Sequence, residues 1–160
     1  MTIKVGDKIP SVKIKHMTKD GVKDITTDEI FGGKKVALFA LPGAFTPTCS
    51  AKHLPGFVQN AGAIKGKGVN TIACLAVNDA FVMDAWGKDQ KVADKVMMLA
   101  DGSAAFTKAV GLELDLLGRG MGVRSQRYAM IIEDGKVTKL NVEAAGAFEV
   151  SSAEHVLSQL

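Results

Sequence analysis

Cys49 and Cys74 are the only cysteines in this chain of 160 residues, and their thiols are its strongest potential nucleophiles. No C-x-x-C pair is present, so neither a zinc knuckle nor a dithiol redox motif is indicated. Two cysteines are also too few for the disulfide framework of a secreted domain. Each cysteine is therefore predicted to be either an inert core residue or a reactive single thiol.

The sequence around Cys49 predicts a reactive position. Residues 41–49 (LPGAFTPTC) follow a continuous apolar run and precede a predicted helix. Catalytic and ligand sites of open α/β sheets lie at that end of the strands. Pro47 suits the first helical turn, where its missing N–H costs nothing. Cys49 then falls in the first turn, where free backbone N–H groups and the helix dipole favour the nucleophilic thiolate.

Cys74 has the surroundings of an inert cysteine. It lies inside the apolar run Val69–Val77 (VNTIACLAV), and free cysteines are among the residue types most often buried. We therefore interpret Cys74 as a core residue and Cys49 as the candidate nucleophile.

The elements that must position Cys49 alternate between strands and helices. Strands are predicted at Val12–His16, Val22–Thr26, Lys35–Leu41, Val69–Val77, Val96–Leu99, Tyr128–Ile132 and Lys136–Leu140, the last two joined by an Asp134-Gly135 turn. Helices are predicted from about Pro47, with a second run to about Lys67, at Ala80–Lys88, at Ala104–Val110, from Ser151 or Ser152 to Leu160, and in a short segment capped by Thr27. This order predicts a single α/β domain over residues 1–160, with a mixed central sheet flanked by helices on both faces.

The composition argues against several functional classes. There are 20 basic and 17 acidic residues, and no Lys/Arg run exceeds two residues, so no nucleic-acid surface is expected. The longest apolar run, Val36–Pro42, is too short to cross a bilayer, and we expect no membrane partner. The three histidines show no metal-ligand spacing. Residues 1–7 (MTIKVGD) do not resemble a signal or transit peptide, so we expect a cytoplasmic protein or one whose targeting segment has been removed.

The segment around Cys49 resembles the active-site signature of the peroxiredoxins. PGAFTPTC followed by SAKHLPGF contains the P-x-x-x-T-x-x-C core of that family, and its Phe45 and HLPGF resemble the type II (type 5) subgroup. Further similar blocks are VNDAFV at 77–82, AWG at 85–87, LADGS at 99–103 and GLELD at 111–115. The resemblance extends from about Val5 to Leu160, and it implies a thioredoxin-like fold and a thiol peroxidase.

The resemblance implies roles for four residues. Cys49 would be the peroxidatic cysteine, and Thr46 would hydrogen-bond its sulfur and a peroxide oxygen. Arg127 matches the distant arginine of the family that reaches the pocket, and Pro42 would shield the sulfur from water. An arginine in this place would stabilise both the thiolate and the charge that develops on the leaving oxygen.

The implied reaction is attack of the Cys49 thiolate on hydrogen peroxide or an alkyl hydroperoxide, which gives a sulfenic acid that a thiol then recycles. The reaction needs no metal or organic cofactor. Some relatives carry another cysteine near the start of the C-terminal helix, but residues 149–153 (EVSSA) contain none. We therefore expect an external thiol, either glutathione with glutaredoxin or thioredoxin, to resolve Cys49. The resemblance also implies a homodimer, for which Phe45, Val82 and Trp86 are candidate contacts.

Several alternatives stay open at this point. The same fold could serve as a peroxide sensor or a redox-switched chaperone, whereas a cysteine hydrolase would need a positioned His–Asn/Asp pair that we cannot identify. His53 could share a helix face with Cys49, and we interpret it as an outer or surface neighbour of the site. Arg119 and Arg124 are interpreted as surface charges. Gly118–Gly122 follows no clear strand, so phosphate binding is not expected there.

Overall fold

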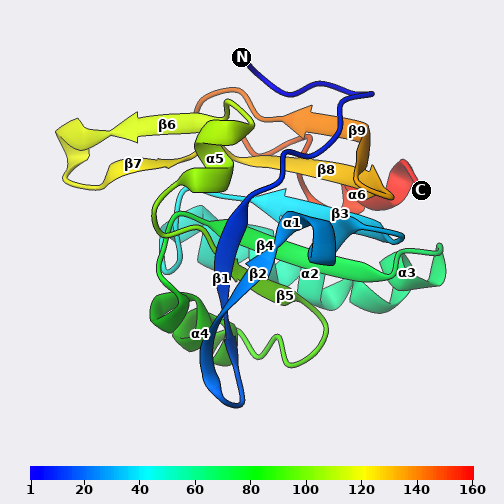
Figure 1. Cartoon of the computed structure of the whole chain (residues 1–160), viewed down its shortest axis with the longest axis horizontal. Coiled ribbons are helices and arrows are strands. Elements are labelled where there is room, and N and C mark those ends of the chain that lie inside the picture. The colour runs from blue at the N-terminus through cyan, green and yellow to red at the C-terminus, as the bar shows by residue number, and fades with distance from the viewer.

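The computed structural model describes all 160 residues and contains a seven-stranded sheet and a separate two-stranded sheet (Figure 1). The strands of the large sheet, in spatial order, are β2 (Gly21–Thr26), β1 (Lys13–Thr18), β5 (Met97–Ala100), β4 (Thr71–Ala76), β3 (Lys35–Ala40), β8 (Tyr128–Glu133) and β9 (Lys136–Val142). The helices are α1 (Thr27–Phe31), α2 (Leu54–Gln59), α3 (Ala61–Gly66), α4 (Ala80–Asp89), α5 (Ala105–Ala109) and α6 (Ala153–Ser158). Strands β3, β4 and β5 are parallel and the other neighbours antiparallel, so the sheet is mixed, as predicted.

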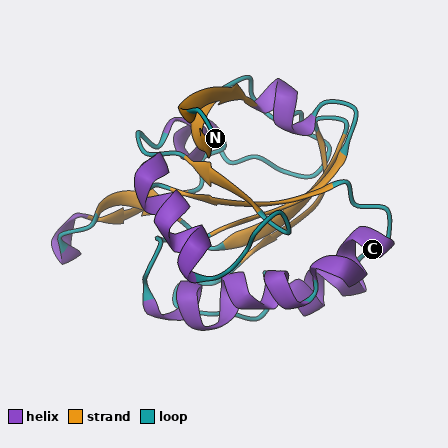
Figure 2. Ribbon diagram, turned by 90° about the horizontal axis from the view of Figure 1, so that it is seen from below, coloured by secondary structure: helices purple, strands orange, loops and turns teal.

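Helices cover both faces of the large sheet (Figure 2). On one face α2, α3, α4 and α6 enclose an apolar cluster that includes Phe39, Phe57 and Trp86. On the other face α1 and α5 enclose a second cluster, which includes Leu38 and Phe106. Successive residues of β3 enter opposite clusters, which is why its sequence is continuously apolar rather than alternating. This arrangement is the thioredoxin-like plan that the sequence predicted.

The first short helix begins one residue earlier than predicted. Thr26, not Thr27, is the N-cap, and it forms a capping box with Glu29. The Thr27 hydroxyl is engaged elsewhere, since it donates to the Pro10 carbonyl at 2.7 Å and accepts from the Val12 N–H at 3.0 Å. Thr27 therefore ties the helix to the segment before β1 instead of capping it.

The sequence prediction missed a β-hairpin. Strands β6 (Glu113–Leu116) and β7 (Gly122–Ser125) pair antiparallel, and Figure 1 shows them extending beyond the large sheet. The glycine-rich segment therefore does follow a strand, contrary to our interpretation, and it forms the tip of this hairpin. Gly120 (φ 72°) and Gly122 (φ 70°) supply the left-handed conformations that the turn requires. The half-exposed strands carry no continuous apolar run, so the signal was weak.

Strand pairing brings distant parts of the chain to one place. The last residue of β3, Ala40, pairs with the first residue of β8, Tyr128. Because the two strands are antiparallel, Arg127 lies beside the loop that follows β3 and leads to Cys49. None of the helices is both long and apolar enough to cross a membrane.

Candidate active site

Cys49 lies in the first turn of a helix, as predicted. Helical structure begins at residue 47, changes to a π-helical turn over Cys49–His53, and continues as α2. The Ser50 N–H donates to the Thr46 carbonyl at 3.0 Å, and the Leu54 N–H donates to the Cys49 carbonyl. Single π-turns inside α-helices occur frequently at functional sites. Cys49 is fully buried, so its sulfur is protected from bulk water.

Arg127 contacts the sulfur directly. Its Nη2 donates a hydrogen bond to the Cys49 Sγ at 3.0 Å. A guanidinium is charged at all relevant pH values and has no acceptor atoms. Its positive charge therefore lies directly beside the sulfur. The structure therefore brings together two residues that are 78 positions apart in the sequence.

His53 holds Arg127 in place. The ring is fully buried, with Nε2 at 2.9 Å from the Ser151 carbonyl and Nδ1 at 2.8 Å from Arg127 Nη1. A carbonyl only accepts and a guanidinium only donates, so Nε2 carries the proton and Nδ1 accepts. Burial, together with the nearby charge of Arg127, lowers the pKa of His53 to about 3. His53 is thus a neutral acceptor for Arg127. It contacts Arg127 rather than the sulfur, so its interpretation as an outer neighbour of the site is confirmed, whereas a surface position is wrong because the ring is fully buried.

Glu143 fixes the turn that carries the Ser151 carbonyl. Its Oε2 accepts hydrogen bonds from three successive backbone N–H groups, those of Glu149, Val150 and Ser151, and from the Ser151 hydroxyl at 2.7 Å. Burial acts to raise the pKa of the Glu143 carboxyl, but these hydrogen bonds outweigh it and the pKa lies below its usual value. Nothing in the local sequence indicated this role.

Phe148 completes the support of the pair formed by His53 and Arg127. Its ring lies edge-on to the His53 ring, with centroids 5.0 Å apart. The Arg127 Cζ lies 5.8 Å from the centroid of the same ring, within the range of a cation–π contact. Phe148 was also missed by the sequence analysis, because an isolated phenylalanine in a loop has no distinguishing pattern.

Thr46 lies next to the site but does not hydrogen-bond the sulfur. Its hydroxyl donates to the Gly43 carbonyl at 2.6 Å. The expected hydrogen bond to Cys49 is absent because the single hydroxyl proton is already used. The Thr46 oxygen keeps its capacity to accept a hydrogen bond from an incoming group.

Arg124 anchors the loop that contains Pro42. Its Nη1 donates to the Pro42 carbonyl at 3.2 Å, and its Nε donates to the Met121 carbonyl at 2.8 Å. A Cβ at Gly43 would lie 2.5 Å from Arg124 Nη1, so glycine there permits the close approach. Arg124 therefore joins β7 to the loop before Cys49, and its interpretation as a surface charge was wrong.

A cavity of about 500 Å³ opens beside Arg127. Its lining residues come from the loop after β3, the helix that carries Cys49, β6, the segment just before β8 and the segment after β9. They include Pro42, Thr48, Lys52, Leu114 and Arg127, with residues 143–149. The cavity combines apolar side chains with two positive residues, Lys52 and Arg127, and two acidic ones, Glu143 and Glu149. It reaches the site at Arg127, whereas Cys49 itself does not line it.

Cys74 is fully buried in β4, as predicted, and both cysteines are free. Burial, and then the nearby Cys49, raises the pKa of the Cys74 thiol well above its usual value. Trp86, one of the residues predicted to contact a partner subunit, is also fully buried, and its Nε1 donates to the Ser50 hydroxyl at 3.0 Å. Trp86 cannot form a subunit contact, so that part of the prediction was wrong.

Together, the fold and the site define a thioredoxin-like protein in which a buried thiol is paired with an arginine. The redoxin family model matches residues 4–157. The chain is 52% identical to peroxiredoxin-2E, chloroplastic, of Arabidopsis thaliana, covering 99% of this chain and 70% of that protein. It is 49% identical to peroxiredoxin-2B of the same plant, covering 99% and 98%.

Solved structures agree with these relatives. Reduced Prx3 of Vibrio vulnificus in complex with H₂O₂ superposes with a TM-score of 0.96 at 54% identity, covering 99% of each chain. The chain belongs to the peroxiredoxin family, in its type II group, and is a thiol peroxidase.

The buried neutral His53 predicts a specific pH dependence of stability. Its pKa falls from an ordinary value of 6.5 to about 3 on folding. Between these values the unfolded chain binds a proton that the folded chain does not, so the free energy of unfolding decreases as pH falls from 6.5. The slope due to one such group approaches about 1.4 kcal/mol per pH unit. Between pH 6 and 5 most carboxylates stay ionised in both states, so denaturant unfolding in this window isolates the histidine.

We expect His53→Gln to remove most of the pH dependence of the free energy of unfolding between pH 6 and 5. The same replacement at the half-buried His16 should leave that pH dependence unchanged. An equal slope in wild type and His53→Gln would contradict the assignment of His53 as the neutral acceptor.

Proposed function

We propose that the protein reduces hydrogen peroxide and alkyl hydroperoxides through a sulfenic acid on Cys49, which an external thiol then reduces. The observation that carries this proposal is the 3.0 Å hydrogen bond from Arg127 Nη2 to the Cys49 sulfur, beside a cavity that admits small molecules. In this proposal Cys49, Thr46, Arg127 and Pro42 are the catalytic residues, and His53 is a positioning residue that acts through Arg127.

The proposed first step is an in-line displacement at oxygen. The Cys49 thiolate attacks one peroxide oxygen, a sulfur–oxygen bond forms, and the O–O bond breaks. The leaving oxygen takes up a proton and departs as water or an alcohol. Arg127 donates to the atoms on which negative charge is redistributed, as donors in an oxyanion hole do. The Thr46 oxygen accepts the peroxide O–H, since its own proton points to the Gly43 carbonyl.

The surroundings of the sulfur support a substrate range beyond hydrogen peroxide. The cavity of about 500 Å³ is far larger than one peroxide molecule, and Leu114, Pro42 and Phe148 line it. Apolar side chains beside Arg127 would accommodate the organic part of an alkyl hydroperoxide. The Pro42 ring would limit the access of water to the sulfur during the reaction.

In the second step an external dithiol or two monothiols reduce the sulfenic acid to thiol, with release of water and formation of a disulfide in the reductant. Cys74 is poorly suited to this task because it is fully buried within β4 and its pKa is raised. We propose glutathione with glutaredoxin, or thioredoxin, as the reductant.

Cys74→Ser should therefore keep most of the peroxidase activity with glutathione and glutaredoxin. The expected change in turnover is less than about twofold, accompanied by some loss of stability because a hydroxyl replaces a buried sulfur. Steady-state peroxide consumption and thermal unfolding measure the two effects. Loss of turnover in a folded Cys74→Ser protein, together with a Cys49–Cys74 disulfide in the oxidised wild type by mass mapping, would overturn the one-cysteine cycle.

We also propose that the protein forms a homodimer through the face near Phe45 and Val82. Phe45 is 54% exposed although it is a large apolar residue, and Phe81, which precedes Val82 in the sequence, is 70% exposed. Exposed apolar groups of this kind mark interaction surfaces when they cluster. Light scattering at micromolar concentration should give twice the monomer mass, and Phe81→Glu should reduce it. A monomer mass for the wild type would contradict this proposal.

A peroxide sensor or a redox-switched chaperone is the alternative function. The two classes differ in turnover, so the decisive test is peroxide consumption with excess thiol donor. Many turnovers per chain are expected from an enzyme, whereas a sensor would stop after one. Intact mass after one equivalent of peroxide, repeated with glutathione, identifies the state of the sulfur and its next partner.

A further inference from the structure

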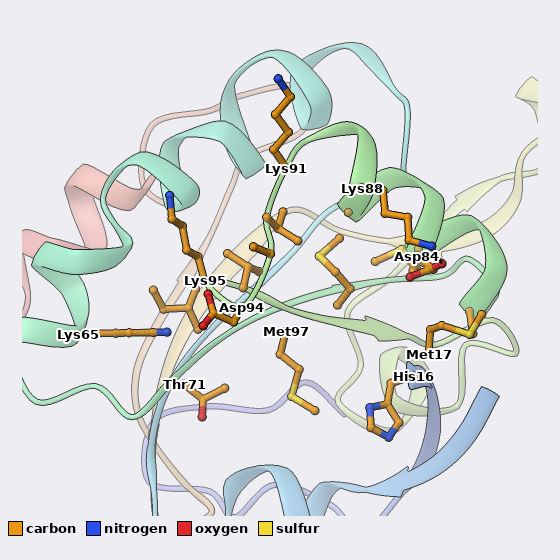
Figure 3. Close-up of a pocket in the computed structure, with 18 of the residues that line it drawn as sticks. His16, Met17, Lys65, Thr71, Asp84, Lys88, Lys91, Asp94, Lys95 and Met97 are labelled. Carbon is orange, nitrogen blue, oxygen red and sulfur yellow. Dashed lines mark ion pairs between the residues drawn. The ribbon is translucent and has the colours of Figure 1, made fainter. Parts of the chain in front are cut away.

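A second cavity, of about 740 Å³, lies away from the catalytic thiol. It is bounded by α4, the segment 91–96 that follows it, the first residues of β4 and β5, and the end of β1 (Figure 3). Strands β3, β4 and β5 are parallel, so all three begin at one end of the sheet and finish at the opposite end. Cys49 follows the last residue of β3. The two cavities therefore lie at opposite ends of these parallel strands.

Methionines form much of the apolar lining of this cavity. Four of the seven methionines in the chain contribute to it, namely Met17, Met83, Met97 and Met98. Met17, Met97 and Met98 are only partly buried, so part of each side chain is available to a ligand. Met98 packs against the core cluster under α4 and Met97 against the cluster on the other face of the sheet, so the lining extends around β5. Methionine is flexible and polarisable and adapts to apolar groups of varied shape. The lining is therefore suited to an aliphatic or aromatic body.

Lysines surround the same cavity. Lys65, Lys88, Lys91 and Lys95 are exposed at its rim (Figure 3), together with Asp84 and Asp94. These four positive and two negative side chains together carry a net charge of +2. Lys88 pairs with Asp84 at 3.0 Å, whereas no ion pair involves Lys65, Lys91 or Lys95. Three ammonium groups thus remain without a partner beside an apolar surface.

Backbone hydrogen bonds fix the rim before any ligand arrives. The Lys91 N–H donates to the Lys88 carbonyl at 3.1 Å, the Val92 N–H donates to the Gly87 carbonyl at 3.0 Å, and the Lys95 N–H donates to the Val92 carbonyl at 2.9 Å. A site that is formed in advance loses less entropy on binding. The volume also falls within the range of about 300–1,000 Å³ that is typical of small-molecule sites.

We propose that this cavity binds small amphipathic carboxylates, with the apolar body over the methionines and the carboxylate at Lys91 and Lys95. The net positive charge of the rim favours an anionic ligand over a neutral one. A divalent cation is disfavoured because no group of three His, Cys, Asp or Glu side chains is close enough to hold one. The limited concave volume favours a free small molecule over an extended polymer.

Trp86 provides a readout that does not depend on peroxidase activity. It is the only tryptophan in the chain, and it lies on α4 between Met83 and Gly87, which both line the cavity. Decanoate is the probe, at concentrations below those at which it forms micelles, titrated into the reduced protein with detection by Trp86 fluorescence and by calorimetry. We expect saturable binding, and binding of the neutral analogue decanol and of the short anion acetate at least tenfold weaker.

The location of the site is tested by charge reversal. The double variant Lys91→Glu, Lys95→Glu should lose at least tenfold in decanoate affinity while keeping its peroxidase activity. The matched control, Lys108→Glu with Lys136→Glu, makes the same change in net charge on α5 and β9 and should bind within twofold of wild type. Unchanged affinity in the Lys91/Lys95 variant, equal binding of decanol or acetate, or no saturable binding would each overturn the proposal.

Discussion

Replacement of Cys49 by serine is expected to reduce peroxide consumption to the rate observed without protein. The serine hydroxyl has a far higher pKa than a thiol, so almost no anion is available as a nucleophile at neutral pH. The hydrogen bond from Arg127 cannot compensate, since it stabilises an anion that serine scarcely forms. The assay is peroxide consumption with glutathione and glutaredoxin in excess, with peroxide measured directly.

Cys74→Ser is the matched control for this experiment, because it makes the same chemical change at the other buried cysteine. Both variants should unfold cooperatively, which would show that loss of activity reflects the missing nucleophile rather than loss of the fold. If the Cys49→Ser protein retained more than about a tenth of wild-type turnover, Cys49 would not be the attacking residue.

The part of the site that local sequence controls was predictable. Strands β3 and β4 are buried on both faces, so their sequences are continuously apolar and identify the centre of the sheet. Pro47 then marks the beginning of the helix, and its spacing to Cys49 places the thiol in the first turn. These inferences need only the chemistry of adjacent residues.

The support around Arg127 depends on contacts between distant residues and could not be predicted in the same way. His53 reaches Arg127 across 74 positions and the Ser151 carbonyl across 98. These residues come into contact because β3 pairs with β8 and because the Glu143 carboxylate binds the backbone N–H groups of residues 149–151. No local pattern distinguishes Glu143 from a solvated glutamate.

Trp86 shows a different limit of sequence analysis. An apolar residue on a helix face near the site can be buried within its own chain or contact a second subunit, and periodicity does not separate these outcomes. The structure separates them because α4 packs on the sheet, with Met83 and Trp86 both directed into the core. Phe45 and Phe81, which are both exposed, remain as large apolar candidates for a contact with a second subunit.

Arg127→Ala is expected to slow the peroxide step by about a hundredfold or more. Loss of one donor to developing negative charge typically costs two to three orders of magnitude in rate. Here the change also removes the positive charge beside the thiolate and leaves Nδ1 of the buried His53 without its donor. The rate constant for oxidation of Cys49 by hydrogen peroxide, measured by rapid mixing before any reductant is added, isolates this step.

Arg127→Lys distinguishes the role of the charge from the role of the geometry. Lysine restores a positive charge, but a single ammonium cannot reproduce the two-pronged contact in which Nη2 reaches the sulfur at 3.0 Å and Nη1 reaches His53 at 2.8 Å. We therefore expect a rate between those of Arg127→Ala and wild type. A rate for Arg127→Ala within about twofold of wild type, in a protein of unchanged fold, would show that the guanidinium does not take part in the peroxide step.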